Sequence, residues 1–134
     1  MNVAILAAIT APLILIFDLL WLGLIMPGFY RANLGHLMSS SIGWGAAIVF
    51  YALYAVGLAY FATQPAVGSL SLMRALLVGA LFGLIAYGTY DLSNQATLRD
   101  WPLIVTVVDM LWGMFLSGAA SAIAYLLATK VFGL

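Results

Sequence analysis

The sequence predicts an all-α integral membrane protein, a single domain over residues 1–134 built as a four-transmembrane-helix bundle with short loops. Composition is the first reason, because 66% of the residues are hydrophobic and only 6% are charged, whereas soluble domains carry about 25% charged residues. The second reason is that the apolar residues gather in four stretches, each near or above the roughly 20 residues that cross a bilayer as a helix. Backbone groups in lipid must bond within the chain, which favours helices over open strands.

The four apolar stretches are separated by three connections that are polar or contain proline or glycine. The expected helices cover residues 3–26, 43–62, 70–92 and 102–130. The connections between them are Pro27–Ile42, Thr63–Ser69 and Ser93–Trp101.

Local residues explain where each expected helix begins or ends. Pro27 should stop the first helix. The serines of Ser39–Ser41 can cap the free N–H groups of the second helix, and Ser69 can cap those of the third. We expect Asp100 to cap the fourth helix, with Pro102 in the first turn, where its missing N–H leaves no bond unmade.

Glycines and tryptophans suggest how the helices pack and where they meet the membrane surface. Gly79 and Gly83 lie one turn apart on the third expected helix, a spacing that lets membrane helices approach closely. We expect this pair to pack inside the bundle, with dimerisation as the alternative. Trp44 and Trp101 stand at helix starts, where tryptophan commonly anchors at the lipid headgroups.

The charge distribution specifies the orientation only weakly. Arg74 and Lys130 fall on the side of the termini, and Arg31 and Arg99 fall on the other side. The comparison of positive charges that usually sets orientation is therefore balanced. We favour a multi-pass protein of the bacterial cytoplasmic (inner) membrane with both termini cytoplasmic. The balance also permits an antiparallel homodimer of opposite orientations.

Several classes of function are disfavoured by composition. A net charge of zero gives no indication of nucleic-acid binding. The absence of cysteine removes thiolate metal sites and thiol nucleophiles. One histidine among a few carboxylates fits no standard metal motif, so no metal is expected, and the sequence indicates no particular cofactor.

Two aspartates inside the apolar stretches are the strongest indication of a functional site. Asp18 is followed three residues later by Trp21, and Asp109 by Trp112. A carboxyl group placed in the hydrocarbon layer costs roughly 3 kcal/mol or more. Both lie eight residues, about 12 Å, inside the same membrane boundary on antiparallel helices. We therefore expect the two carboxyls to meet at one level.

Other polar residues fall in the same half of the bundle. Spacings of three and four residues place Tyr87, Asp91 and Asn94 on one helix face. The full expected ligand-binding set is Asp18, Trp21, Tyr87, Asp91, Asn94, Thr106, Asp109 and Trp112. The loops of that side add Arg31, His36 and Arg99 as counter-ions. The alternative is structural: the aspartates pair with arginine, tyrosine or tryptophan simply to hold the helices together. A stripe on the second expected helix, formed by Tyr51, Tyr54, Leu58 and Phe61, is expected to be packing rather than a site for a flat ligand.

Longer motifs overlap this polar cluster. They are Phe29-Tyr30-Arg31-x-x-Leu34-Gly35-His36-Leu37, then Tyr87-Gly88-Thr89-Tyr90-Asp91-Leu92-x-Asn94-x-Ala96-Thr97-Leu98, and Trp101-Pro102 followed by Asp109-x-x-Trp112-Gly113. Together with Asp18-x-x-Trp21, they resemble the bacterial membrane-protein family catalogued as domain of unknown function 2177, over nearly the whole chain. Ser93 departs from the family pattern, which has threonine there. The resemblance implies a small four-helix membrane protein and supplies no established activity.

Three functions fit these observations. The first is binding or transport of a small hydrophobic or cationic molecule, because paired intramembrane carboxyls stand beside aromatic residues. The second is a membrane-embedded enzyme acting on lipid or isoprenoid substrates, with paired aspartates as acid and base. The third is a non-catalytic accessory subunit of a larger membrane complex. Expected partners are therefore the lipid bilayer, a small ligand, and a second copy or a larger complex.

Overall fold

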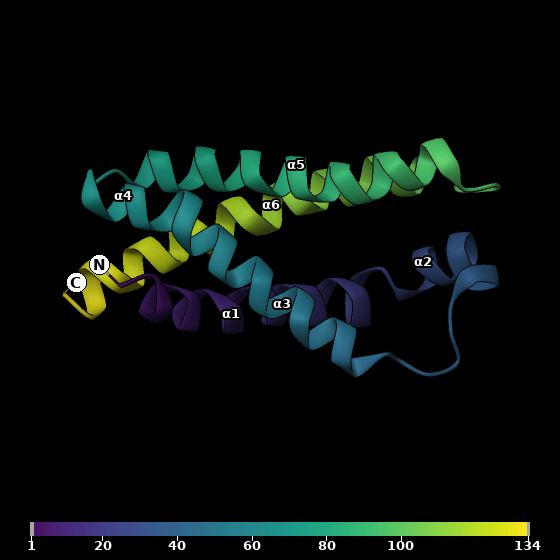
Figure 1. Ribbon diagram of the computed structural model, residues 1–134, viewed down its shortest axis with the longest axis horizontal. Coiled ribbons are helices and arrows are strands. Elements are labelled where there is room, and N and C mark those ends of the chain that lie inside the picture. The colour runs from purple at the N-terminus through teal and green to yellow at the C-terminus, as the bar shows by residue number, and fades with distance from the viewer. Residues whose placement is uncertain (1, 134) are drawn as a thin grey trace.

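The structure, a computed structural model that describes residues 2–133, confirms the all-α four-span architecture. The four membrane-length helical spans are Val3–Ile25, Trp44–Gly68, Leu72–Thr97 and Leu103–Val131. No strand occurs among the described residues. The two ends of the chain lie at the same end of the bundle, as an even number of spans requires (Figure 1).

Short π-helical turns interrupt or extend three of the four spans. In chain order the elements are α1 (Val3–Leu20), η1 (Trp21–Ile25), α2 (Pro27–Leu34), η2 (Gly35–Leu37), α3 (Trp44–Leu58), η3 (Ala59–Thr63), α4 (Gln64–Gly68), α5 (Leu72–Thr97), α6 (Leu103–Leu126) and η4 (Leu127–Val131). The first span is α1 with η1, the second is α3 with η3 and α4, the third is α5, and the fourth is α6 with η4.

The connections are more helical than the sequence predicted. Pro27 does not merely end the first span; it occupies the first turn of α2, where a proline is tolerated. Pro65 plays the same part in α4, so the second span continues to Gly68. The third span continues past residue 92 to Thr97, whose hydroxyl donates to the Ser93 carbonyl one turn earlier (2.8 Å).

Three expected helix caps are wrong because the helices begin later than predicted. Gly43, rather than a serine, precedes α3. Ser71, rather than Ser69, caps α5 by accepting a hydrogen bond from the Arg74 N–H (3.1 Å). Pro102 precedes α6, and no side chain caps that helix. Ser69 precedes the start of α5, and its hydroxyl instead donates to the Pro65 carbonyl at the end of α4 (2.9 Å).

The closest helix contact joins α5 to α6, which lie side by side along most of their length (Figure 1). Their backbones nearly touch at the predicted glycines. A Cβ atom added to Gly83 would lie 1.9 Å from the Gly113 carbonyl oxygen, and one added to Gly79 would lie 2.7 Å from the Ser117 carbonyl oxygen. The glycine pair therefore packs inside the bundle, as the sequence predicted.

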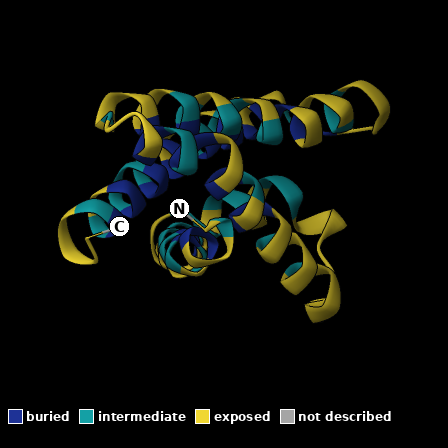
Figure 2. Ribbon diagram, turned by 60° about the vertical axis from the view of Figure 1, so that its left-hand side comes forward, coloured by how far each residue is buried: buried dark blue, intermediate teal, exposed yellow. Residues whose placement is uncertain are grey.

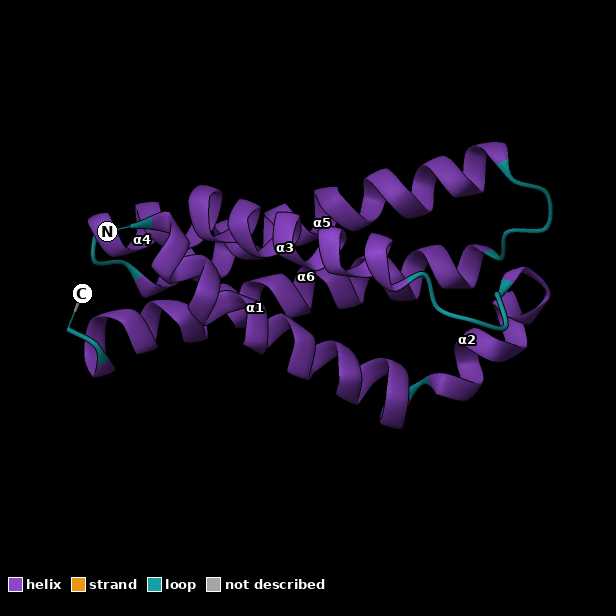
Figure 3. Ribbon diagram, turned by 60° about the horizontal axis from the view of Figure 1, so that its bottom comes forward, coloured by secondary structure: helices purple, strands orange, loops and turns teal. Residues whose placement is uncertain are grey.

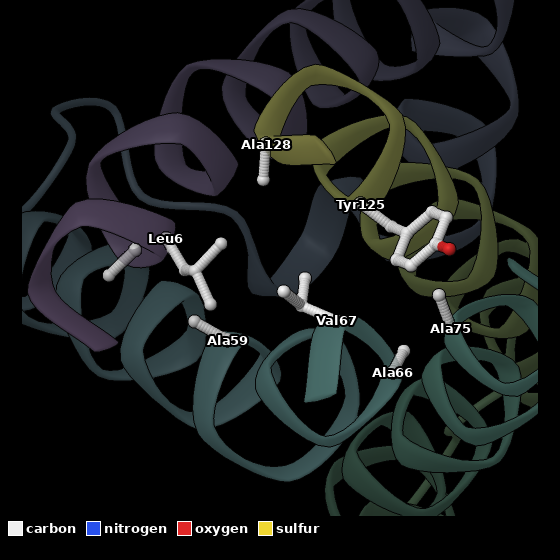
Figure 4. Close-up of a cluster of buried hydrophobic side chains, with 8 residues drawn as sticks. Leu6, Ala59, Ala66, Val67, Ala75, Tyr125 and Ala128 are labelled. Atoms are coloured by element: carbon white, nitrogen blue, oxygen red, sulfur yellow. The ribbon is translucent and has the colours of Figure 1, made fainter. Parts of the chain in front are cut away.

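A cluster of buried side chains packs the end of the bundle that holds the termini. Small side chains from all four spans meet there, and Figure 4 shows them around Leu6 and Tyr125. The alanines of this cluster are Ala7, Ala59, Ala66, Ala75 and Ala128. Towards the opposite end α3 stays against α1 and diverges from α5 (Figure 1). The separation of α3 from α5 therefore lies in the half away from the termini.

The outer surface is apolar and suits lipid. Buried residues follow the lines where helices meet, and exposed residues cover the outer faces (Figure 2). Large side chains such as Leu24 and Leu53 are 74% and 68% exposed. Trp44 is exposed as well, but Trp101 is only 7% exposed, and its indole N–H donates to the Thr106 hydroxyl (3.0 Å). The expectation that Trp101 anchors at the headgroups is therefore wrong, because the indole is held inside the protein.

Replacing Gly83 with alanine should destabilise the bundle, because the new methyl group would collide with backbone rather than with a flexible side chain. We expect Gly83→Ala to lower the free energy of unfolding in detergent by about 1–3 kcal/mol, the usual range for overpacking. Gly45→Ala is the matched control, since a Cβ at that helical position meets nothing within 4 Å. Equal stability of the two variants would contradict the close contact of α5 and α6.

Candidate functional site

A cavity of about 490 Å³ lies in the half of the bundle away from the termini. All four spans and α2 contribute to its wall, and α2 lies at this end of the molecule (Figure 3). The lining residues are Asp18, Trp21, Leu22, Tyr30, Leu34, Phe50, Tyr51, Tyr54, Ala86, Tyr87, Tyr90, Asp109 and Trp112. Eight of these are aromatic and two are aspartates, so the wall is mostly ring faces with two carboxyl groups.

The cavity forms where α3 diverges from α5, and a cluster of buried side chains closes its inner end. Ile14, Leu58 and Leu116 are almost fully buried in the cluster that closes the inner end of this half. Beyond that cluster, Phe50 on α3 and Tyr90 on α5 both line the cavity and are 46% and 55% exposed. The cavity is therefore bounded on this flank by two half-exposed rings.

Asp18, near the end of α1, is held by two neutral donors. The Tyr51 hydroxyl donates to its Oδ2 (2.7 Å), and the Trp112 indole N–H donates to its Oδ1 (3.0 Å). The residue is only 6% exposed. Each carboxyl oxygen thus keeps one bond inside the protein, and the donors come from α3 and α6.

Asp109 on α6 is held from the other side of the same cavity. The Tyr30 hydroxyl donates to its Oδ1, and the Trp21 indole N–H in turn donates to the Tyr30 oxygen (2.9 Å). The rings of Trp21 and Trp112 stack with their centroids 4.3 Å apart and 6° between their planes. The two Asp-x-x-Trp motifs are therefore interleaved, since each tryptophan serves the aspartate of the other motif.

Tyr30 keeps its hydroxyl proton at neutral pH and so remains a hydrogen-bond donor. Burial raises the pKa of its phenol above the ordinary value, and the hydrogen bond to Asp109 raises this pKa further. The residue sits on α2, outside the four spans, so the short helix brings a fixed donor to a carboxyl inside the bundle.

Five of the eight expected ligand-binding residues line the cavity. They are Asp18, Trp21, Tyr87, Asp109 and Trp112. The other three lie behind or beside its wall. Thr106 is buried and bonds the side-chain oxygen of Gln95 (2.9 Å), Asn94 is half-buried, and Asp91 is fully buried against Asp109 without reaching the cavity.

The three expected counter-ions do not reach the aspartates. Arg31, His36 and Arg99 are exposed, and within residues 2–133 they form no ion pair with any carboxyl. Hydroxyl and indole groups take their place at Asp18 and Asp109. Nor do three or more His, Cys, Asp or Glu side chains gather as a metal site in the described part of the chain.

Several wall residues escaped the sequence analysis. Tyr51 and Tyr54 were expected to be packing, yet both line the cavity, and Tyr51 bonds Asp18. Their depth was the available signal, because Tyr51 lies seven residues inside the start of α3, close to the level of the aspartates. Tyr30 gave no such signal, because depth cannot be counted in a connection that is not expected to be helical.

Comparison with known proteins identifies the family alone. No curated protein and no solved structure matches the chain significantly. A family model described as "Predicted membrane protein (DUF2177)" matches residues 3–126. Since that match covers nearly the whole chain, the protein belongs to the DUF2177 family of predicted membrane proteins.

Proposed function

We propose that the protein binds or transports a small amphiphilic molecule that combines an apolar body with a cationic group. The observation that carries this proposal is that Asp18 and Asp109, on different helices, border one aromatic-walled cavity of about 490 Å³. Cavities that bind small organic molecules commonly range from about 300 to 1,000 Å³ and combine apolar walls with a few polar groups. The size and lining both support such a ligand.

The chemistry of the wall favours a positive charge. Asp18 uses only one lone pair on each oxygen, so a carboxylate there can accept further bonds from a ligand. The described residues place no ion-paired lysine, arginine or histidine at either aspartate. Aromatic rings attract cations to their faces, and the stacked Trp21 and Trp112 present such faces beside both carboxyls. An anion would meet repulsion from both carboxylates.

The position of the cavity supports access from the bilayer. The half-exposed rings of Phe50 and Tyr90 stand where α3 and α5 separate, on a surface that is otherwise apolar. A molecule dissolved in lipid could reach the carboxyls by displacing these two rings. This route suits an apolar body better than a fully hydrated ion.

We further propose that the chain resides in the bacterial cytoplasmic membrane with both termini cytoplasmic. The chain contains no cysteine, so Ser40→Cys and Ser69→Cys each introduce a single thiol at exposed positions at opposite ends of the bundle. We expect a membrane-impermeant maleimide to label Ser40→Cys in intact cells and to label Ser69→Cys only after the membrane is opened. The reverse pattern would overturn this orientation, and labelling of both in intact cells would indicate both orientations.

The proposal is tested first by asking what the protein carries. Native mass spectrometry of protein extracted gently from its own membranes should show a bound small molecule. Asp18→Asn should reduce its occupancy about tenfold or more, because hydrogen bonds to a charged group are worth about 1.5–3 kcal/mol. Asp100→Asn, in an exposed turn, is the matched control and should retain it.

Other outcomes of this measurement favour the other functions. A stable assembly with further subunits and no small molecule would favour the accessory role. A bound lipid or isoprenoid that is chemically converted by the purified protein would favour an enzyme. The near-ultraviolet circular dichroism of the stacked tryptophans reports whether each variant keeps the site intact.

Filling the cavity should abolish binding without unfolding the bundle. Ala86 lies on the cavity wall, so Ala86→Leu places three more carbon atoms in the space that the ligand would take. We expect the occupancy of the bound molecule to fall at least as much as in Asp18→Asn, with thermal stability in detergent nearly unchanged. Ala46→Leu, on an exposed surface of α3, should have no effect. Undiminished binding in Ala86→Leu would place the ligand elsewhere.

A further inference from the structure

Asp91 is the carboxyl that the proposed binding site leaves unexplained. It is 0% exposed, and neither of its side-chain oxygens has a hydrogen-bond donor within reach among the described residues. A carboxylate removed from water without donors or a cation is strongly unfavourable. The surroundings of Asp91 therefore disfavour the charged carboxylate and favour the neutral carboxylic acid.

The groups that face Asp91 are themselves acids or phenols. The Asp109 carboxyl on α6 is the acidic group that interacts with it. Tyr30 on α2 and Tyr90 on α5 are close enough to interact with it electrostatically. Asp18 on α1 interacts electrostatically with Asp109. Within residues 2–133 no lysine, arginine or histidine forms an ion pair with any of these carboxyls.

A proton between the two carboxyls resolves this arrangement. Two carboxylates only accept hydrogen bonds, so they cannot bond one another, whereas a protonated acid supplies one O–H donor. Tyr30 already donates to Asp109, which favours negative charge on Asp109. Asp91 has no donor of its own, which favours the neutral acid there. The donors therefore assign the proton to Asp91.

We propose that Asp91 is a protonated carboxylic acid that donates a hydrogen bond to Asp109 and so keeps Asp109 as the anionic contact for a monovalent organic cation in the cavity. Asp91 is then a positioning residue, because it acts through Asp109 and does not touch the cavity. The ligand part of this inference rests on the proposed function, but the protonation of Asp91 does not. A buried neutral acid that serves as a donor has precedent in enzyme sites that stabilise negative charge.

Infrared spectroscopy tests the protonation without any ligand. The chain has only four acidic side chains, all aspartates, so the carbonyl stretch of a protonated acid can be assigned by substitution. We expect this band at neutral pH in the wild-type protein, its loss in Asp91→Asn, and its persistence in Asp100→Asn. A spectrum in which Asp91→Asn removes no protonated-acid band would overturn the inference.

A second measurement tests the role of that proton, with tetraphenylphosphonium as the cation. Asp91→Asn keeps a donor of the same shape and should bind this cation within about threefold of wild type. Asp91→Leu has the same branched shape, with two larger methyl groups in place of the carboxyl oxygens, but no donor, so Asp109 should take up a proton in its place. The cation must then displace that proton, and its affinity should fall about tenfold or more and recover as pH rises. Equal affinities and pH profiles in the two variants would overturn the positioning role.

The two proposals fail separately. If tetraphenylphosphonium binds none of these proteins, the result counts against the proposed function, while the infrared band still decides whether Asp91 is protonated. If wild type binds the cation but lacks the infrared band, the inference about Asp91 is wrong and the cation site remains. Asp109→Asn should lose cation binding whichever form Asp91 takes.

Discussion

The backbone contact between α5 and α6 is the constraint on which the rest of the structure depends. Gly83 and Gly113 let the two helices approach so closely that no side chain fits between them. The same missing side chain at Gly113 leaves room for the Tyr87 ring, since a Cβ there would lie 2.3 Å from that ring. Close packing therefore both joins the helices and turns a tyrosine towards the cavity, and it also brings Asp91 against Asp109.

The interleaved aspartate and tryptophan motifs satisfy the carboxyls without cations. A purely structural role would account for these hydrogen bonds, because polar contacts between membrane helices contribute modestly to holding a bundle together. The cavity is what a structural role leaves unexplained. Protein interiors are normally packed to the density of organic crystals, with few voids larger than a water molecule. A space of about 490 Å³ beside two carboxyls is much larger than packing defects of that kind.

The sequence was sufficient to predict the fold and the common level of the two aspartates. Both follow from apolar length and from the fixed rise of a helix, which do not depend on how the helices pack. The partners of the carboxyls could not be predicted in the same way. They depend on the rotation of each helix about its axis and on α2, whose helical form appears only once Pro27 is placed in a first turn. Opposite charges suggested Arg31 and Arg99, but hydrated arginines in exposed segments gain little by entering lipid.

The packed alanine cluster and the proposed binding cavity lie in different parts of this bundle. The alanine cluster joins all four spans in the half near the termini. The aspartates lie beyond that cluster, where α3 has left α5 and where neutral donors already satisfy Asp18 and one oxygen of Asp109. Sites that are far apart and share no partners contribute nearly additively to stability. Neutralising a carboxyl of this cavity should therefore leave the packed half folded, as the proposed binding of a cationic molecule from the bilayer requires.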